Sequence, residues 1–184
     1  MPAPWKRLRT HRENDYTILT IREDIVQDPR SLTEHPRVVI QCPSWVNVVA
    51  LTPALEVIMV KQWRVGVREN TLEVPGGMVD GGEAPAQAAL RELEEETGHR
   101  AKRLTELGWV HPNPAIQTNR AWTFLAEDCF HVHDGNPDPG EDLLVERVPI
   151  GEIPKLIRAA QITHALTVSA FYLYDARKSE PHKT

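Results

Sequence analysis

Apolar residues along the chain fall into short extended runs and a few stretches with helical spacing. Two nearly continuous apolar runs, 45–51 and 55–60, are joined by Thr52-Pro-Ala54 and predict a hairpin with at least one strand in a sheet centre. Shorter β-runs follow at 72–74, 104–110, 121–126 and 143–148. Helical spacing predicts helices near 84–97, 153–161 and 164–178. This order predicts an α/β fold with a mixed sheet between helices rather than regular βαβ winding.

The first 42 residues have a different pattern. They mix charge with two β-branched pieces, 16–21 and 37–41, which a turn at 28–31 separates. Two or three strands with one weak apolar face do not form a core alone. We therefore expect a β-rich appendage at 1–42, which packs on the main domain, 43–184, or on another subunit.

Composition and charge exclude several kinds of partner. With 41% apolar and 26% charged residues among 184, the chain is an ordinary globular protein. A net charge of −5 argues against long nucleic acid or an anionic membrane as partner, but not against a small anion bound through a divalent metal. No run approaches the ~20 apolar residues of a membrane span, and the start lacks a signal-peptide core. With Cys42 and Cys129 outside CxxC spacing, the sequence predicts a cytoplasmic protein with reduced thiols.

Residues 75–99 carry the candidate chemistry. A loop with four glycines is free of Cβ constraints and is able to approach a ligand with its backbone, and a helix follows from near Ala84 to Gly98. At roughly 100° per residue, the helix places three glutamates within an arc of about 100°. These are Glu92, Glu95 and Glu96. The adjacent arc, expected to face the sheet, consists of Ala86, Ala89, Leu90 and Leu93.

Three carboxylates at positions i, i+3 and i+4 repel one another and destabilise a helix. Arg91 is the only cation near them in the sequence. A solvated acidic face is one interpretation of such a cluster. A divalent cation explains the crowding better, because Mg²⁺ binds carboxylate oxygens and shares phosphate ligands.

The spacing of these residues resembles the Nudix box. The matching positions are Gly77, Glu83, Arg91, Glu92, Leu93, Glu95, Glu96 and Gly98, while His99 stands where the box has an aliphatic residue. The resemblance implies a Nudix fold and metal-dependent hydrolysis of a diphosphate. It further implies Mg²⁺ or Mn²⁺ bound by Glu92, Glu95, Glu96 and the Gly76 carbonyl. Arg91 would orient the carboxylates, Glu83 would support them, and Arg91 and Glu95 count among the catalytic residues.

Outside the box, the chain resembles the branch that cleaves ADP-ribose and nucleoside diphosphate sugars. Lys61-Gln-Trp-Arg64 and Glu73-Val-Pro-Gly-Gly77 are similar to motifs of that branch. The resemblance implies that Arg64 binds a phosphate and Glu73 the nucleobase or sugar. A surface arginine at a strand end and a sheet-edge carboxylate are the alternatives.

Three further residues are candidates for the substrate site. Pro114 stands where the branch places a proline in a loop beside the substrate. In related enzymes N-terminal strands form a homodimer whose second subunit completes the base pocket, so we expect 1–42 to be a dimerisation segment. Trp5 and Trp45 are candidates for stacking on the base, with packing roles equally open.

The general base is expected on a loop before the strand that precedes the final helices. Glu141 occupies that place, with Asp142 and Asp138 as alternatives. The expected function is hydrolysis of a nucleoside diphosphate sugar, such as ADP-ribose, to a nucleoside monophosphate and a sugar phosphate. The alternatives are a pyrophosphatase for dinucleotides of the NADH or CoA type and a non-catalytic nucleotide sensor.

Overall fold

The computed structural model describes residues 1–136, 140 and 142–178, and these form two compact units. The N-terminal unit consists of Met1–Pro43 together with His111–Arg120. The larger unit consists of Ser44–Val110 and the described residues from Ala121 onward. No helix in the described part of the chain is both long and apolar enough to cross a membrane.

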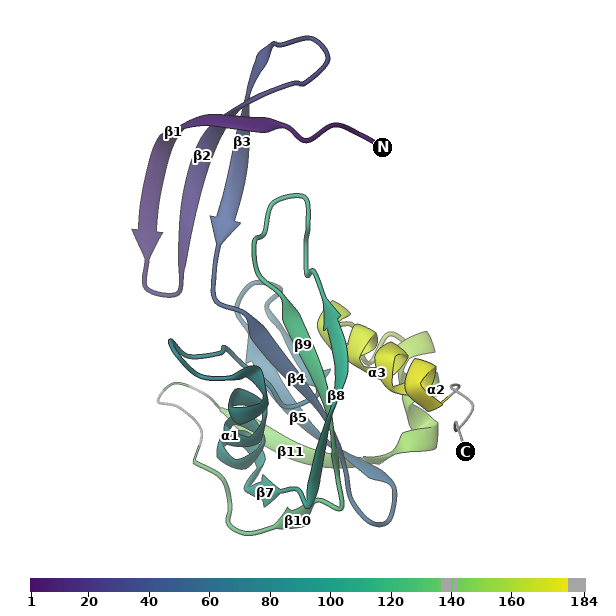
Figure 1. Ribbon diagram of the computed structural model, residues 1–184. Helices are drawn as coiled ribbons and strands as arrows, with labels where there is room; N and C mark the ends of the chain where they lie inside the picture. The colour runs from purple at the N-terminus through teal and green to yellow at the C-terminus, as the bar shows by residue number, and fades with distance from the viewer. Residues whose placement is uncertain (137–139, 141, 179–184) are drawn as a thin grey trace. The chain divides into compact units, whose positions relative to one another are not determined.

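A mixed six-stranded sheet forms the centre of the larger unit (Figure 1). Its strands are β4 (Trp45–Leu51), β5 (Glu56–Arg64), β6 (Glu69–Glu73), β8 (Arg103–Val110), β9 (Ala121–Glu127) and β11 (Leu143–Pro149). The order is β11-β5-β4-β9-β8, with β6 paired to β5. Only the β4–β9 pair among them is parallel. The predicted β4–β5 hairpin is confirmed.

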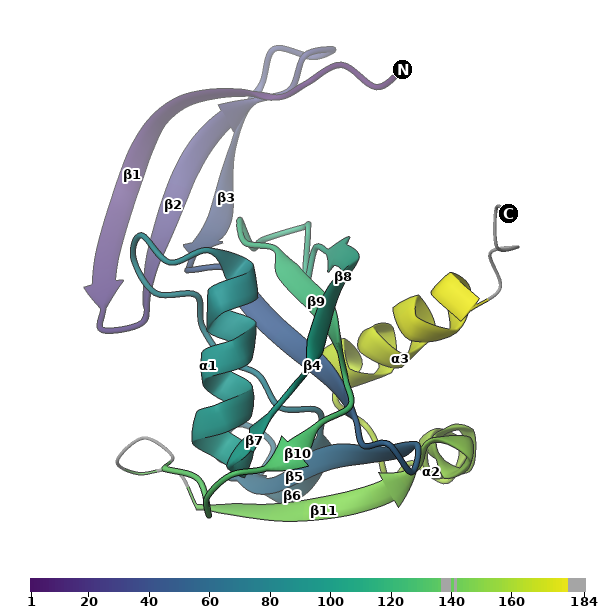
Figure 2. The same cartoon turned by 60° about the horizontal axis from the view of Figure 1, so that its bottom comes forward.

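Helices cover both faces of this sheet. They are α1 (Pro85–Thr97), α2 (Ile153–Arg158), which follows a 3₁₀ turn at Ile150–Glu152, and α3 (Ala165–Lys178). Because neighbouring side chains on a strand point to opposite faces, Val48 packs in the core with α1, while Val49 packs in the core with α2 and α3. Figures 1 and 2 show α1 on one side of the sheet and α3 on the other. The predicted arrangement of a sheet between helices is confirmed.

The C-terminal end of α1 is fixed by a glycine. Gly98 has a φ of 65°, and a Cβ there would lie 1.6 Å from the His133 carbonyl oxygen. Its own carbonyl accepts a hydrogen bond from Val132 N at 2.8 Å. The short strands β7 (His99–Arg100) and β10 (Phe130–His131) pair directly beside this turn. Only glycine fits this position, and the predicted helix end is confirmed.

The N-terminal unit is a three-stranded antiparallel sheet. Its strands are β1 (Lys6–Tyr16), β2 (Leu19–Gln27) and β3 (Glu34–Gln41). The prediction that 16–21 forms one extended piece is wrong, because residues 17–18 form the turn between β1 and β2. The loop 111–120 binds β3: Ile40 N donates to Ile116 O at 2.7 Å, and Thr118 N donates to Ile40 O at 3.1 Å.

Candidate active site

The candidate site is built on α1 and the glycine loop before it. Pro85 lies in the first turn of the helix, and Gln87 Oε1 accepts a hydrogen bond from Ala84 N at 3.0 Å. The buried residues of α1 are Ala88, Ala89, Leu93, Glu96 and Thr97. The prediction that Ala86 and Leu90 face the sheet is wrong, since both are exposed. The helix is rotated so that Glu96 faces inward.

Glu96 is buried because it binds the backbone of the glycine loop. The residue is 4% exposed, and its Oε2 accepts a hydrogen bond from Gly76 N at 2.9 Å. On the other side of the loop, the carbonyls of Pro75 and Gly77 accept hydrogen bonds from β4 at 2.8 and 2.9 Å. The loop therefore joins the central strand to the carboxylates of α1.

The absence of two side chains makes this close packing possible. A Cβ on Gly76 would lie 2.1 Å from the carbonyl oxygen of Val46. A Cβ on Gly77 would lie 2.4 Å from Oε1 of Glu92. Gly76 thus allows contact with β4, and Gly77 leaves room for a carboxylate of α1.

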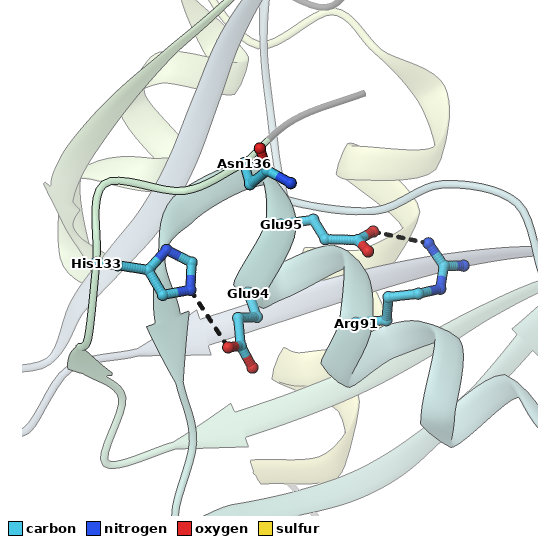
Figure 3. A pocket seen from close by; sticks show the side chains of 5 residues that line it. All are labelled: Arg91, Glu94, Glu95, His133 and Asn136. Carbon is cyan, nitrogen blue, oxygen red and sulfur yellow. Dashed lines mark hydrogen bonds and ion pairs between the residues drawn. The ribbon is translucent and has the colours of Figure 1, made fainter. Parts of the chain in front are cut away.

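Arg91 holds the neighbouring carboxylates together. Its Nη1 donates to Glu92 Oε1 and to Glu95 Oε2, each at 2.9 Å (the contact with Glu95 is drawn in Figure 3). Its Nε and Nη2 donate to the two carboxylate oxygens of Glu83 at 3.1 Å. These hydrogen bonds, those to Glu83 foremost, raise the pKa of Arg91 above its usual range, and the Arg91 guanidinium lowers the pKa of Glu83. The positive charge therefore relieves the repulsion among the glutamates.

The donor set of this cluster fits a hard divalent cation. Three carboxylates project from one helix, with Glu92 against Gly77 and Glu96 against Gly76. Oxygen ligands of this kind suit Mg²⁺ and Mn²⁺. As they stand, no three His, Cys, Asp or Glu side chains of the described residues form a group that could hold a metal ion. In this structure Arg91 lies between Glu92 and Glu95 and neutralises them.

Two predicted substrate residues bind each other. Arg64 donates through Nε and Nη2 to the two oxygens of Glu73, each at 2.8 Å. Glu73 is 2% exposed and also accepts a hydrogen bond from Thr71 Oγ1. The site therefore contains an ion pair at the strand ends next to the glycine loop, in which the carboxylate is buried and the guanidinium is partly exposed.

The other predicted substrate residues are distributed over both units. Trp45 is half-buried at the start of β4, and its backbone forms an isolated antiparallel β-bridge with Met78. Trp5 belongs to the N-terminal unit, where its ring lies 5.6 Å from that of His35 and 5.0 Å from the Arg37 guanidinium. Pro114 is exposed in the loop of the same unit. Their roles at the substrate stay predictions.

The predicted general base, Glu141, lies outside the described residues, as does the alternative Asp138. Asp142, the nearer alternative, is exposed and directly precedes β11. It lines a hollow of about 230 Å³ together with Lys61, Asn70 and Leu144.

A second hollow, of about 400 Å³, lies beside α1 and was not predicted from the sequence (Figure 3). It is lined by Arg91, Glu94, Glu95, His133 and Asn136. Asn136 N donates to the Glu95 carbonyl at 2.7 Å, so the segment after β10 is attached to the last turn of α1. His133 Nε2 lies 3.3 Å from Glu94, whereas His131 contacts His99 and Asp134. Backbone contacts of this kind leave no signal in the sequence.

His99, which departs from the box, is buried and hydrogen-bonded. Its Nδ1 lies 2.7 Å from the Thr97 carbonyl, and its Nε2 lies 3.3 Å from Arg147 Nη2. A carbonyl needs a donor and a guanidinium needs an acceptor, so the ring is neutral with its proton on Nδ1. Burial is the main cause that lowers the pKa of His99. The imidazole thus fills the place of an aliphatic side chain without an unsatisfied polar atom.

Comparison with known proteins supplies first the fold class and then the family. The crystal structure of an ADP compounds hydrolase superposes with a TM-score of 0.83 and 22% identity, over 96% of this chain and 95% of that one. This likeness establishes the α/β/α fold of that class of proteins. Residues 43–169 match the NUDIX domain model. The chain belongs to the Nudix family, and it is a Nudix hydrolase.

Two relatives are similar over most of the chain. An ADP-ribose pyrophosphatase of Bacillus subtilis (strain 168) is 35% identical over 135 residues, 73% of each chain. An ADP-sugar pyrophosphatase of Mus musculus is 43% identical over 136 residues, 67% of this chain and 62% of that protein. These relatives agree with the branch that the residues outside the box resemble.

Proposed function

We propose that this enzyme hydrolyses the diphosphate bond of a nucleoside diphosphate sugar of the ADP-ribose type, with Mg²⁺ or Mn²⁺ as cofactor. The products are a nucleoside monophosphate and a sugar phosphate. The observation that carries the proposal is the placement of Glu92 and Glu96 against the Gly76–Gly77 backbone, with Glu95 joined to Glu92 through Arg91. The names of the two relatives support the substrate class.

Four groups of the chain would hold the metal: the carboxylates of Glu92, Glu95 and Glu96 and the carbonyl of Gly76. A bound divalent cation neutralises the diphosphate oxygens and lowers the pKa of an attacking water. Arg91 keeps the carboxylates at the loop through its contacts with Glu92, Glu95 and Glu83. Arg64 binds a phosphate oxygen of the substrate. Trp5 and Trp45 would be the candidates for stacking on the base, and Pro114 would belong to a loop beside the substrate.

Hydrolysis needs a group that accepts the proton of the attacking water. The water oxygen forms a bond to one phosphorus, the bridging P–O bond breaks, and the water proton passes to a base. Because the box carboxylates are committed to the metal, we assign the base to Glu141, with Asp142 as the alternative.

The N-terminal strands, residues 1–42, would form a homodimer, and residues 43–184 would form the catalytic domain. Large apolar side chains of the N-terminal sheet are exposed, with Tyr16 at 58% and Val38 at 48%. A second copy of the chain would cover such side chains.

A substrate panel tests the function. The purified enzyme is incubated with ADP-ribose, other nucleoside diphosphate sugars, NADH, CoA and a nucleoside triphosphate, with Mg²⁺ or with EDTA, and the products are identified. Metal-dependent release of AMP and ribose 5-phosphate from ADP-ribose is expected. Glu96→Gln should lower turnover by at least about 10²-fold, and wild-type turnover in this variant at saturating Mg²⁺ would exclude Glu96 as a ligand. Preferred cleavage of NADH or CoA would assign the enzyme to dinucleotides.

A further inference from the structure

A buried carboxylate lies where β6 runs into the glycine loop. Glu73 is the last residue of β6, is 2% exposed, and directly precedes Val74-Pro-Gly-Gly77. A carboxylate removed from water needs donors around it, because burial without partners is strongly unfavourable. The identity of these donors therefore shows what Glu73 does.

Three elements supply the donors. Arg64, at the end of β5, forms a bidentate ion pair with Glu73. The Thr71 hydroxyl of β6 donates a hydrogen bond to Glu73, and His164 Nδ1 lies 2.9 Å from Glu73 Oε2. Burial raises the pKa of Glu73, but the hydrogen bonds from Arg64, His164 and Thr71 outweigh it and hold the pKa well below its usual range. Glu73 is therefore an anion, and an ionised carboxylate only accepts hydrogen bonds.

The first turn of α3 fixes both the side chain and the backbone at this point. His164 directly precedes α3, and its carbonyl accepts a hydrogen bond from Val168 N at 3.0 Å. Thr167, one turn on, is fully buried, and its hydroxyl accepts a hydrogen bond from Val74 N at 3.4 Å. The strand end that enters the Gly76–Gly77 loop is thus attached to α3.

The pair orients Arg64. The Arg64 side chain is 44% exposed, whereas that of Glu73 is 3% exposed, so the guanidinium reaches from a buried anchor toward solvent. A guanidinium is planar, and binding through Nε and Nη2 fixes the direction of all its N–H groups. Glu73 has its two oxygens directed at these donors rather than at solvent.

We propose that Glu73 and His164 are positioning residues, which hold the Arg64 guanidinium in the orientation that binds a phosphate of the substrate, and that Glu73 does not contact the nucleotide. This inference rests on the proposed function, in which Arg64 binds the diphosphate. It gives Glu73 a different role from the one that the family resemblance implies.

A double-mutant cycle separates positioning from direct contact. Wild type, Glu73→Gln, Arg64→Ala and the double variant are compared by kcat and KM for ADP-ribose. If Glu73 acts through Arg64, each single variant raises KM about tenfold with little change in kcat, and the double variant is no worse than Arg64→Ala. Additive effects, or a Glu73→Gln enzyme that alone changes preference between substrates differing only in the base, would overturn the proposal.

His164 is tested by a conservative replacement. His164→Ala should raise KM severalfold, and His164→Asn, which keeps a short N–H donor, should restore most of the loss. Thr163→Ala, an exposed neighbour, is the matched control and should match wild type. Equal KM values for the alanine variant and wild type would remove His164 from the positioning role.

Two further measurements keep the outcome clear. Melting temperatures identify variants that fold poorly. If Arg64→Ala is one of them, Arg64→Lys takes its place, because lysine keeps a positive charge beside Glu73 but does not form the bidentate ion pair. The same cycle is measured as Kd for an ADP-ribose analogue with a methylene bridge, which is not hydrolysed. Absence of turnover in wild type would refute the proposed function, whereas additive Kd effects would refute only the positioning role.

Discussion

Replacing Gly77 by alanine tests the role of Glu92 without altering a carboxylate. The added Cβ would lie 2.4 Å from Glu92 Oε1 and 2.6 Å from Cδ, whereas ordinary contact begins near 3.4 Å. Glu92 must therefore move by about 1 Å. The obstructing atoms are the end of a flexible side chain, so the backbone is able to stay in place.

The expected effect is large on catalysis and small on stability. Mg²⁺ requires near-ideal geometry with oxygen distances of roughly 2.0–2.1 Å, so a shift of this size removes Glu92 as a ligand. Misplacement by about 1 Å corresponds to a loss of about 10²-fold in kcat, or about 2.7 kcal/mol of activation free energy. The φ angle of Gly77 lies outside the left-handed region, so the free energy of unfolding should change by no more than about 1 kcal/mol.

The assay measures kcat over a series of Mg²⁺ concentrations, with melting temperature in parallel. Two alanine variants of the same loop are matched controls. Gly81→Ala meets nothing within 4 Å and should be active, and Gly76→Ala meets the backbone of Val46 and should be less stable. If Gly77→Ala turns over within about threefold of Gly81→Ala, the placement of Glu92 against Gly77 has no catalytic importance.

Three other predictions follow. Deleting residues 1–40 should convert a dimer to a monomer, or to an aggregating protein, and weaken substrate binding; a full-length protein that sediments as a monomer at micromolar concentration would contradict this. Glu141→Gln should lower kcat by roughly 10²–10⁴ with little change in Mg²⁺ binding, and Asp142→Asn should be mild; the reverse ranking would move the base to Asp142. Burial, followed by Arg147 and His131, lowers the pKa of His99 below its ordinary value of 6.5. The unfolded chain therefore binds a proton at this residue more readily than the folded chain does, so stability falls as the pH drops below about 6.5. His99→Val should lack this fall in melting temperature as the pH drops from about 6.5 to about 5.

The sequence predicted those features whose cause is local. Helix α1 has its stop signal in Gly98, and the β4–β5 hairpin has apolar runs on both sides of a proline turn, so both were predictable. Which side of α1 faces the sheet was predictable only in part. Apolar spacing favoured Ala86 and Leu90 as inward residues, but a hydrogen bond from Gly76 N makes the burial of Glu96 favourable and rotates the helix.

The N-terminal unit shows why other elements were missed. Strand β1 carries mostly charged residues, and its sequence has no alternating apolar face to indicate a strand. It is extended because it pairs with β2 from one end to the other, with two shifts in register. The association of 111–120 with β3 rests on backbone hydrogen bonds at Ile40, which any side chain at that position would permit.

The glycine loop connects the fold to the proposed metal site. Its backbone is fixed from three directions: β4 donates to the carbonyls of Pro75 and Gly77, Glu96 of α1 accepts from Gly76 N, and Thr167 of α3 accepts from Val74 N. A short segment with so many fixed backbone groups has little freedom to adjust, so a displacement on any side reaches the others. This is why residues far apart in sequence, such as His164 and Glu92, are expected to influence one site. Close packing, rather than flexibility, explains why these two positions are glycines. A Cβ on Gly76 would displace β4, and a Cβ on Gly77 would displace Glu92.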